Sequence, residues 1–171
     1  MYRISASPSL LIFMLSFTLS LSACGFRLAG TADLPEQLSS IYLVTSGFKD
    51  SQRKTLQRSL ALAGATLVEQ ADAGAVKLSV NLKVLPDRQM ATGAGSGANV
   101  KRITRQLDFS VKSAEGKPIV PNTTLSQQRD ASLDDDNLLS SDREKEAVTR
   151  DLEKALFDQL IRQLTLIQIV S

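Results

Sequence analysis

The chain has 171 residues, of which 43% are hydrophobic, 22% charged and 5% aromatic; this composition is typical of about one ordinary globular domain. It contains no histidine and a single cysteine. These counts exclude a Ser/His/Asp triad, a Cys/His dyad, a zinc site built from histidines or several cysteines, and an internal disulfide. The 20 lysines and arginines exceed the 18 acidic residues by only two, which argues against a dedicated nucleic-acid-binding protein.

The N-terminus is typical of a secretory signal. Arg3 supplies positive charge and residues 10–21 form an apolar run, which is too short to span a bilayer because a span needs about 20 residues. The following Leu21-Ser22-Ala23-Cys24 looks like a bacterial lipobox, in which the cysteine thiol receives diacylglycerol and the new amine is acylated. We predict removal of residues 1–23, S-diacylglycerol and N-acyl groups on Cys24, and no cofactor or metal. The alternative is an ordinary signal peptide with a chance cysteine.

The residue after the cysteine predicts the destination. Gly25 stands where an aspartate would retain a bacterial lipoprotein at the inner membrane, so by analogy we expect lipid anchoring in the outer membrane. Two or more acyl chains give stable attachment. Residues 24–38 hold two glycines and a proline and are predicted to be a tether. Residues 39–171 are then predicted to form a single domain.

A strand and a helix are expected first in this domain. Residues 40–45 are β-branched and aromatic, which suits a buried strand. Asp50 or Ser51 can cap a helix in which apolar residues recur at helical spacing. These apolar residues are Leu56, Leu60, Ala63 and Leu67.

Two alternating segments follow. Residues 76–84 and 103–111 each alternate apolar and polar side chains, so each predicts a strand with one buried and one wet face. Residues 86–99 between them contain a glycine-rich stretch and predict a flexible hairpin tip. The two strands should therefore pair antiparallel.

The last third of the chain predicts one more strand and a long helix. Pro121 confines a weakly patterned strand at residues 119–129 to a sheet edge. After the acidic linker at residues 134–137, Ser141-x-x-Glu144 is a capping box that opens a helix ending near Thr165. The order β-α-β-β-β-α predicts an α+β two-layer sandwich, in which two helices cover one face of a four-stranded, mostly antiparallel sheet. The other face is expected to be polar.

Positive charge gathers around the hairpin. Lys101, Arg102 and Arg105 follow its tip and Arg88 precedes it, so one end of the hairpin is predicted to bind phosphates or carboxylates. The alternative is a solvated strand face without a ligand. The Gly93-x-Gly-x-x-Ala98 match is not taken as a nucleotide site, because a strand rather than a helix follows it. The acidic run at residues 134–136 lacks the ligand spacing of a calcium loop.

Phe157 and Ile161 are predicted to lie outside the main apolar stripe of the last helix. A helix with two apolar faces either sits deep in its own core or meets another protein. We favour a partner surface at these two residues, with the core of the chain as the alternative. The apolar tail at residues 164–170 has the same ambiguity and could add an edge strand.

The chain resembles the lipopolysaccharide-assembly lipoproteins of the LptE family, also called RlpB. The start Cys24-Gly25-Phe26-Arg27-Leu28-Ala29-Gly30 is close to the family's C-G-F/W-x-L-R-G, and the last helix ends in Gln159-Leu160-Ile161-Arg162-Gln163-Leu164. The two alternating strands around a basic hairpin also match. The resemblance implies a non-enzymatic protein of Gram-negative bacteria seated in the LptD barrel of the outer membrane, as plug and assembly partner of the translocon that delivers lipopolysaccharide to the outer leaflet.

The resemblance also gives the candidate residues their roles. It implies lipopolysaccharide as the ligand of Arg88, Lys101, Arg102 and Arg105, and LptD as the partner that meets Phe157 and Ile161. One alternative is a lipoprotein adaptor for another envelope component, such as peptidoglycan, or for another outer-membrane assembly machine. An enzyme is the other alternative. We predict none, because the carboxylates of residues 134–142 lie in a polar linker without the apolar surroundings that raise a catalytic pKa.

Overall fold

The computed structural model describes residues 34–70, 74–92, 98–134 and 138–167. The chain divides into two compact units, residues 1–31 and residues 32–171, and the fold described below belongs to the second. The predicted signal peptide, the lipidation site and most of the tether lie outside the described residues. So do most of the acidic linker and the end of the apolar tail.

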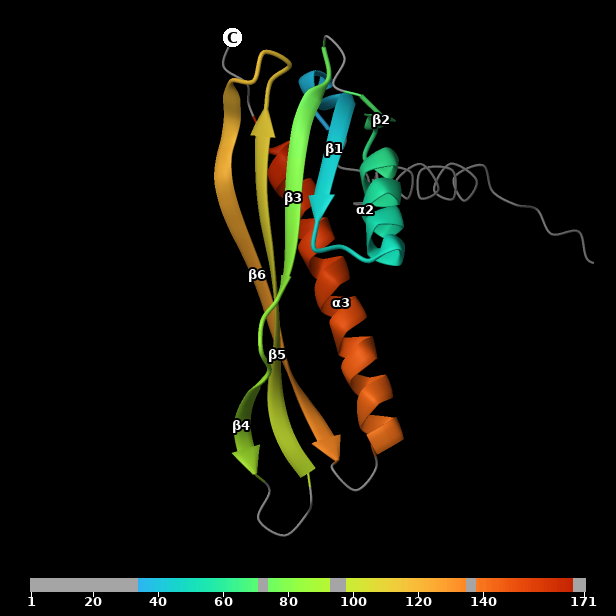
Figure 1. Ribbon diagram of the computed structural model, residues 1–171, viewed down its shortest axis with the longest axis vertical. Coiled ribbons are helices and arrows are strands. Elements are labelled where there is room, and N and C mark those ends of the chain that lie inside the picture. Colours follow the sequence, from blue (N-terminus) through green and yellow to red (C-terminus); the bar gives the residue numbers. More distant parts are fainter. Residues whose placement is uncertain (1–33, 71–73, 93–97, 135–137, 168–171) are drawn as a thin grey trace, which may run out of the picture. The chain divides into compact units, whose positions relative to one another are not determined.

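The domain has two layers. Helices α2 and α3 both lie against one face of a mixed sheet (Figure 1), so the predicted α+β two-layer arrangement is confirmed. In chain order the elements are η1 (Glu36–Leu38), β1 (Ser40–Ser46), α2 (Asp50–Leu62), β2 (Thr66–Val68), β3 (Val76–Val84), β4 (Arg88–Thr92), β5 (Ala98–Lys112), β6 (Pro118–Asp134) and α3 (Leu138–Thr165).

The described sheet has six strands rather than the four predicted. Its order is β2-β1-β3-β5-β4, and β6 pairs with β5 along the other side. The strand β1 runs parallel to β2 and β3, whereas the other pairs are antiparallel. The two unpredicted strands are β2, whose three residues are too few to show a period, and β4, which extends the hairpin expected to be a flexible tip. β6 pairs only with β5, as expected of an edge strand.

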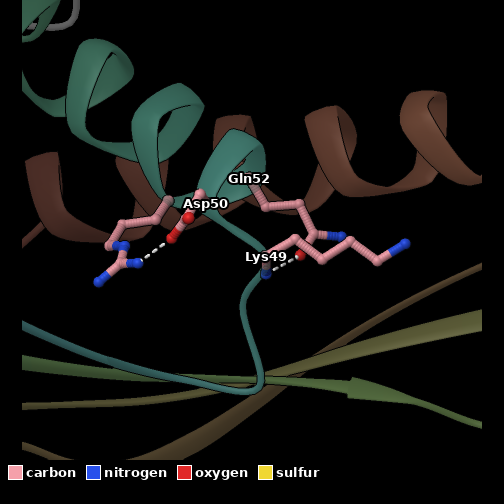
Figure 2. Close-up of polar contacts among 4 residues, drawn as sticks. Lys49, Asp50 and Gln52 are labelled. Carbon is pink, nitrogen blue, oxygen red and sulfur yellow. Dashed lines mark hydrogen bonds and ion pairs between the residues drawn. The ribbon is translucent and has the colours of Figure 1, made fainter.

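Both helices begin earlier in the chain than the sequence predicts. Lys49 precedes α2, and its backbone N–H donates to Gln52 Oε1 at 2.7 Å, while Asp50 pairs with Arg53 (Figure 2). The glutamine side chain thus satisfies a backbone donor beside the first turn. The helix α3 begins at Leu138, so the expected cap at Ser141 lies inside the helix.

Two separate clusters of apolar side chains fill the space between the layers. We call the larger one the base core, since it lies under β1, β3 and α2, and the smaller one the tip core, since it lies near the hairpin end of β5. The base core contains Leu38, Ile41, Leu56, Leu60, Ala65, Val76, Leu78, Val80, Leu82, Leu107, Phe109, Val111, Leu125, Leu156, Phe157, Leu160 and Leu164. The tip core contains Ile103, Ala131, Leu133, Val148 and Leu152.

Candidate functional site

The cations predicted to form one site lie on both faces of the sheet. Side chains alternate along β5, and the buried Ile103 faces the helices. Lys101 and Arg105 therefore belong to the helix-covered side of β5, whereas Arg102 belongs to the open side. Arg88 pairs in register with Arg102 and is exposed. The structure brings Arg88 and Arg102 together but separates them from Arg105.

Arg102 is already engaged by a carboxylate. Its Nε lies 2.7 Å from Asp130 Oδ1 and its Nη2 lies 2.9 Å from Asp130 Oδ2, which is the two-pronged geometry that guanidinium groups make with carboxylates. The hydrogen bonds and charge of Arg102 lower the pKa of Asp130, and Asp130 raises the pKa of Arg102. An anionic ligand of Arg102 must therefore compete with Asp130.

Arg105 is a buried residue rather than a surface cation. It is 5% exposed, and its guanidinium donates to the carbonyl of Thr104 at 2.9 Å and to Thr149 Oγ1 on α3 at 3.1 Å. Its Nε has no hydrogen-bond partner among the described residues. The expectation that Arg105 lies on the surface beside the hairpin tip is wrong. The alternation of apolar and polar residues along β5 could have predicted this burial, because Arg105 lies on the same face as Ile103 and Leu107.

Glu153 and Arg105 form the centre of a buried polar seam that crosses the layers. Glu153 is 7% exposed and accepts a hydrogen bond from Gln52 Nε2 at 2.6 Å. Burial raises the pKa of Glu153, and the Gln52 hydrogen bond and the charges of Arg105 and Lys49 oppose this effect. Sequence reasoning missed Glu153, since a charged residue in an amphipathic helix normally faces water.

Phe157 belongs to the base core. It is 2% exposed, and its ring stacks on Phe48 with centroids 5.9 Å apart and planes at 14°. Ile161 is half-buried and packs against the same core. The expectation that Phe157 lies outside the apolar stripe is wrong, because residues of the segment before α2 cover this side of α3. Phe157 therefore has almost no exposed surface for a partner, whereas Ile161 is partly exposed.

The open face of the sheet is polar, as expected, and its central charges are paired. Lys83 Nζ lies 2.5 Å from Asp108 Oδ2, and Thr124 Oγ1 donates to Asp108 Oδ1 at 2.7 Å. These two contacts lower the pKa of Asp108. Ser46 Oγ donates to Asn81 Oδ1 at 2.9 Å on the same face. The middle of the open face therefore combines hydroxyl and amide groups with neutralised charges.

The hairpin end also exposes apolar side chains that the sequence did not single out. We call this end the tip; it comprises β4, residues 98–104 of β5, residues 128–134 of β6 and the first turns of α3, which lie at the same end of the domain (Figure 1). Met90 is 47% exposed, Leu138 69% and Leu139 76%. The tip thus presents cations and large apolar side chains together.

Three further features were considered as sites: a membrane-spanning helix, a metal site and a surface groove. The described part of the chain has no helix with the length and hydropathy of a membrane span. It also has no group of three or more acidic or cysteine side chains that could hold a metal ion. A groove of about 580 Å³ lies between α2 and the β1–β2 edge, and Arg58 and Glu69 are among its lining residues.

The comparisons with known proteins agree with this architecture. The model of the family "LptE: Lipopolysaccharide-assembly" matches residues 38–164. The LPS-assembly lipoprotein LptE of Photorhabdus laumondii is 25% identical over 145 residues, which cover 84% of this chain and 78% of that protein.

Two solved structures share the fold. Lipoprotein B from Nitrosomonas europaea has a TM-score of 0.64 at 17% identity, covering 82% of this chain and 90% of that one. Rare lipoprotein B from Shewanella oneidensis has a TM-score of 0.61 at 14% identity, covering 73% and 92%. Since the family model spans most of the domain, the chain belongs to the LptE family of lipopolysaccharide-assembly lipoproteins.

Proposed function

We propose that this chain is anchored in the outer membrane through lipids on Cys24, plugs the LptD barrel and assists its assembly, and binds lipopolysaccharide at its tip. Membership of the lipopolysaccharide-assembly family supports the general role. The lipobox-like sequence supports the anchor. What the proposal adds is LptD as the partner and the tip residues as the contacts to lipopolysaccharide. The proposed activity is binding without catalysis.

The composition of the tip is the observation that carries the ligand proposal. Lipid A combines phosphates with acyl chains, and the tip combines Arg88, Lys101 and Arg102 with the exposed Met90 and Leu139. The forked Asp130 contact holds Arg102 in place until a phosphate replaces the carboxylate. Arg105 acts indirectly, since it is fixed beneath α3.

The open face supports the placement inside a barrel. A wide barrel lumen is polar and water-filled, and a plug in it needs surfaces that tolerate water and form hydrogen bonds. The paired Lys83 and Asp108 and the hydroxyl of Thr124 give the sheet such a surface. The same surface would also suit an adaptor for peptidoglycan, which is therefore the second candidate.

Replacement of the three tip cations tests the ligand proposal. The variant Arg88→Ser/Lys101→Ser/Arg102→Ser should lower lipopolysaccharide binding by at least about tenfold, because each cation near an anionic surface contributes on the order of 1 kcal/mol. The matched control Arg53→Ser/Lys54→Ser/Arg58→Ser removes three charges from α2. Binding should fall as salt rises. An equal loss in both variants would mean that net charge, not the tip, governs binding.

Co-purification separates the proposed partner from the second candidate. Native chain extracted in detergent should bring down LptD, whereas an adaptor for peptidoglycan would remain with the cell wall. The triple tip variant should still recover LptD, because the proposal assigns those cations to lipopolysaccharide. Recovery with the cell wall alone would replace the barrel proposal by the adaptor.

A further inference from the structure

Two lysines lie directly opposite each other at the end of the open face that is farthest from the tip. Lys77 of β3 pairs in register with Lys112 of β5, and both side chains are exposed. Side chains directly opposite on an antiparallel pair are about 5 Å apart at Cβ, and like charges in such a pair are destabilising. The position therefore favours an external anion.

The nearby acidic residues do not neutralise this pair. Asp108, four residues before Lys112 on β5, is occupied by Lys83 and Thr124. The described residues provide no ion pair for Lys77 or Lys112. In the turn after β5, the hydrogen bond from Ser113 Oγ at 2.7 Å, and to a lesser degree the charge of Lys117, lower the pKa of Glu115, so Lys117 and Glu115 contribute one charge of each sign. Lys77 and Lys112 therefore leave an excess of positive charge at this end of the open face.

An aromatic side chain extends the row of lysines across the sheet. Tyr42 of β1 pairs in register with Lys77, so both side chains lie on the open face, and Tyr42 is half-buried. Tyrosine is enriched at the headgroup level of membranes, because its ring is apolar and its hydroxyl is polar. We call Tyr42, Lys77 and Lys112 the lysine row.

The chain enters the domain at the same end. The backbone N–H of Leu34 donates to the carbonyl of Ala63 at 3.0 Å, and Thr66 donates to Ser39 at 2.6 Å. Ser40 and Thr66 are partners at the start of β1 and β2, and Ser40 lies two residues before Tyr42, the partner of Lys77. The first described residue, Leu34, therefore lies at the same end of the domain as the lysine row, beside the end of α2.

We propose that the lysine row binds the anionic headgroup surface of the membrane that carries the lipid anchor. The lysines supply phosphate-binding charge, and Tyr42 lies beside them at headgroup depth. This contact would hold the lysine-row end of the domain at the bilayer surface. The biological setting rests on the proposed anchoring at Cys24, whereas the affinity for headgroups is a property of the domain itself.

Vesicle binding without the anchor tests this surface. The chain from residue 24 onward with Cys24→Ser keeps the whole compact domain and removes the site of lipidation. It should bind vesicles containing phosphatidylglycerol, and the binding should weaken with salt. The variant Lys77→Gln/Lys112→Gln should bind about 25-fold more weakly, from about fivefold for each lysine. The control Lys54→Gln/Lys154→Gln removes the same charge from α2 and α3 and should bind as the parent does.

Three results would overturn the inference. One is equal binding to neutral phosphatidylcholine vesicles, and another is an equal loss in the lysine-row variant and its control. The third is a selective loss of binding to lipopolysaccharide aggregates with unchanged binding to phosphatidylglycerol, since this would assign the lysines to the ligand of the proposed function. Failure of the anchor itself would leave the vesicle result unchanged, so the two proposals fail separately.

Discussion

The base and the tip of the sheet differ in how they are covered. At the base, α2 and α3 both cover the strands, and seventeen of the described buried residues form one apolar cluster. At the tip, α3 alone covers β5 and β6, and five described residues form the second apolar cluster. The buried pair Arg105 and Glu153 lies where the two clusters meet. Additional polar contacts hold the tip to α3. Lys145 Nζ lies 2.5 Å from Asp87 Oδ2, and Arg129 Nη1 lies 2.9 Å from Asp151 Oδ2.

This difference implies that the two ends of the sheet contribute differently to the stability of the domain. The base buries enough apolar surface to determine the stability of the domain, while the tip relies on few apolar contacts and on exposed ion pairs, which each contribute little. Regions with few buried contacts open at lower free energy than the core. The proposed ligand site is therefore on the part of the domain that can adjust.

Loss of a base-core side chain should have the largest effect. Leu156 is 0% exposed, so Leu156→Ala should lower the free energy of unfolding by about 3 kcal/mol through lost burial and a new cavity. Chemical denaturation monitored by circular dichroism measures it. The control Leu62→Ala removes the same atoms from a side chain that is 71% exposed and should change stability by less than about 0.5 kcal/mol. Similar losses in both variants would contradict the assignment of the core.

A tip-core substitution should have a smaller and more local effect. Val148 is 9% exposed in the tip core, and Val148→Ala should cost about 1 kcal/mol. Amide exchange should accelerate in β4 and in residues 98–103 of β5 while β3 stays protected. A matched Val80→Ala variant in the base core should instead accelerate exchange in both regions. Uniform acceleration by Val148→Ala would show that the two cores open together.

The sequence predicts the elements whose burial has a clear period. Residues 76–84 were predicted as a strand and form β3, because five apolar residues alternate with polar ones over its whole length. The strand β2 could not be predicted, since three residues make no pattern and a parallel partner far along the chain holds them. The start of α3 was missed because Leu138 and Leu139 are exposed and so give no core-facing signal.

The candidate site was harder to predict than the fold. The sequence shows that cations gather near the hairpin, but only the alternation within β5 decides which of them reach the surface. Arg102 and Arg105 are three residues apart and lie on opposite faces. The burial of Phe157 depends on its contact with Phe48, which lies more than one hundred residues earlier in the chain. Such contacts between distant segments leave no local pattern.

The smallest effect concerns the polar seam at the junction of the two cores. Burial raises the pKa of Glu153 above its ordinary value of 4.5, so the folded state binds the proton more tightly than the unfolded state does. The resulting contribution to stability is fully present below the ordinary pKa and is lost as the pH rises through the folded-state pKa. Glu153→Gln removes this titration and keeps an oxygen that can accept from Gln52.

The stability of Glu153→Gln relative to the native chain should therefore increase from acidic to neutral pH. Denaturation at a series of pH values measures the difference, and the same substitution at the exposed Glu146 corrects for the loss of one negative charge. A relative stability that falls as the pH rises would mean that attraction to Arg105 outweighs the cost of burial. In that case the seam would lock the tip to the base as an ion pair, and the two regions would be more tightly coupled than their separate apolar clusters indicate.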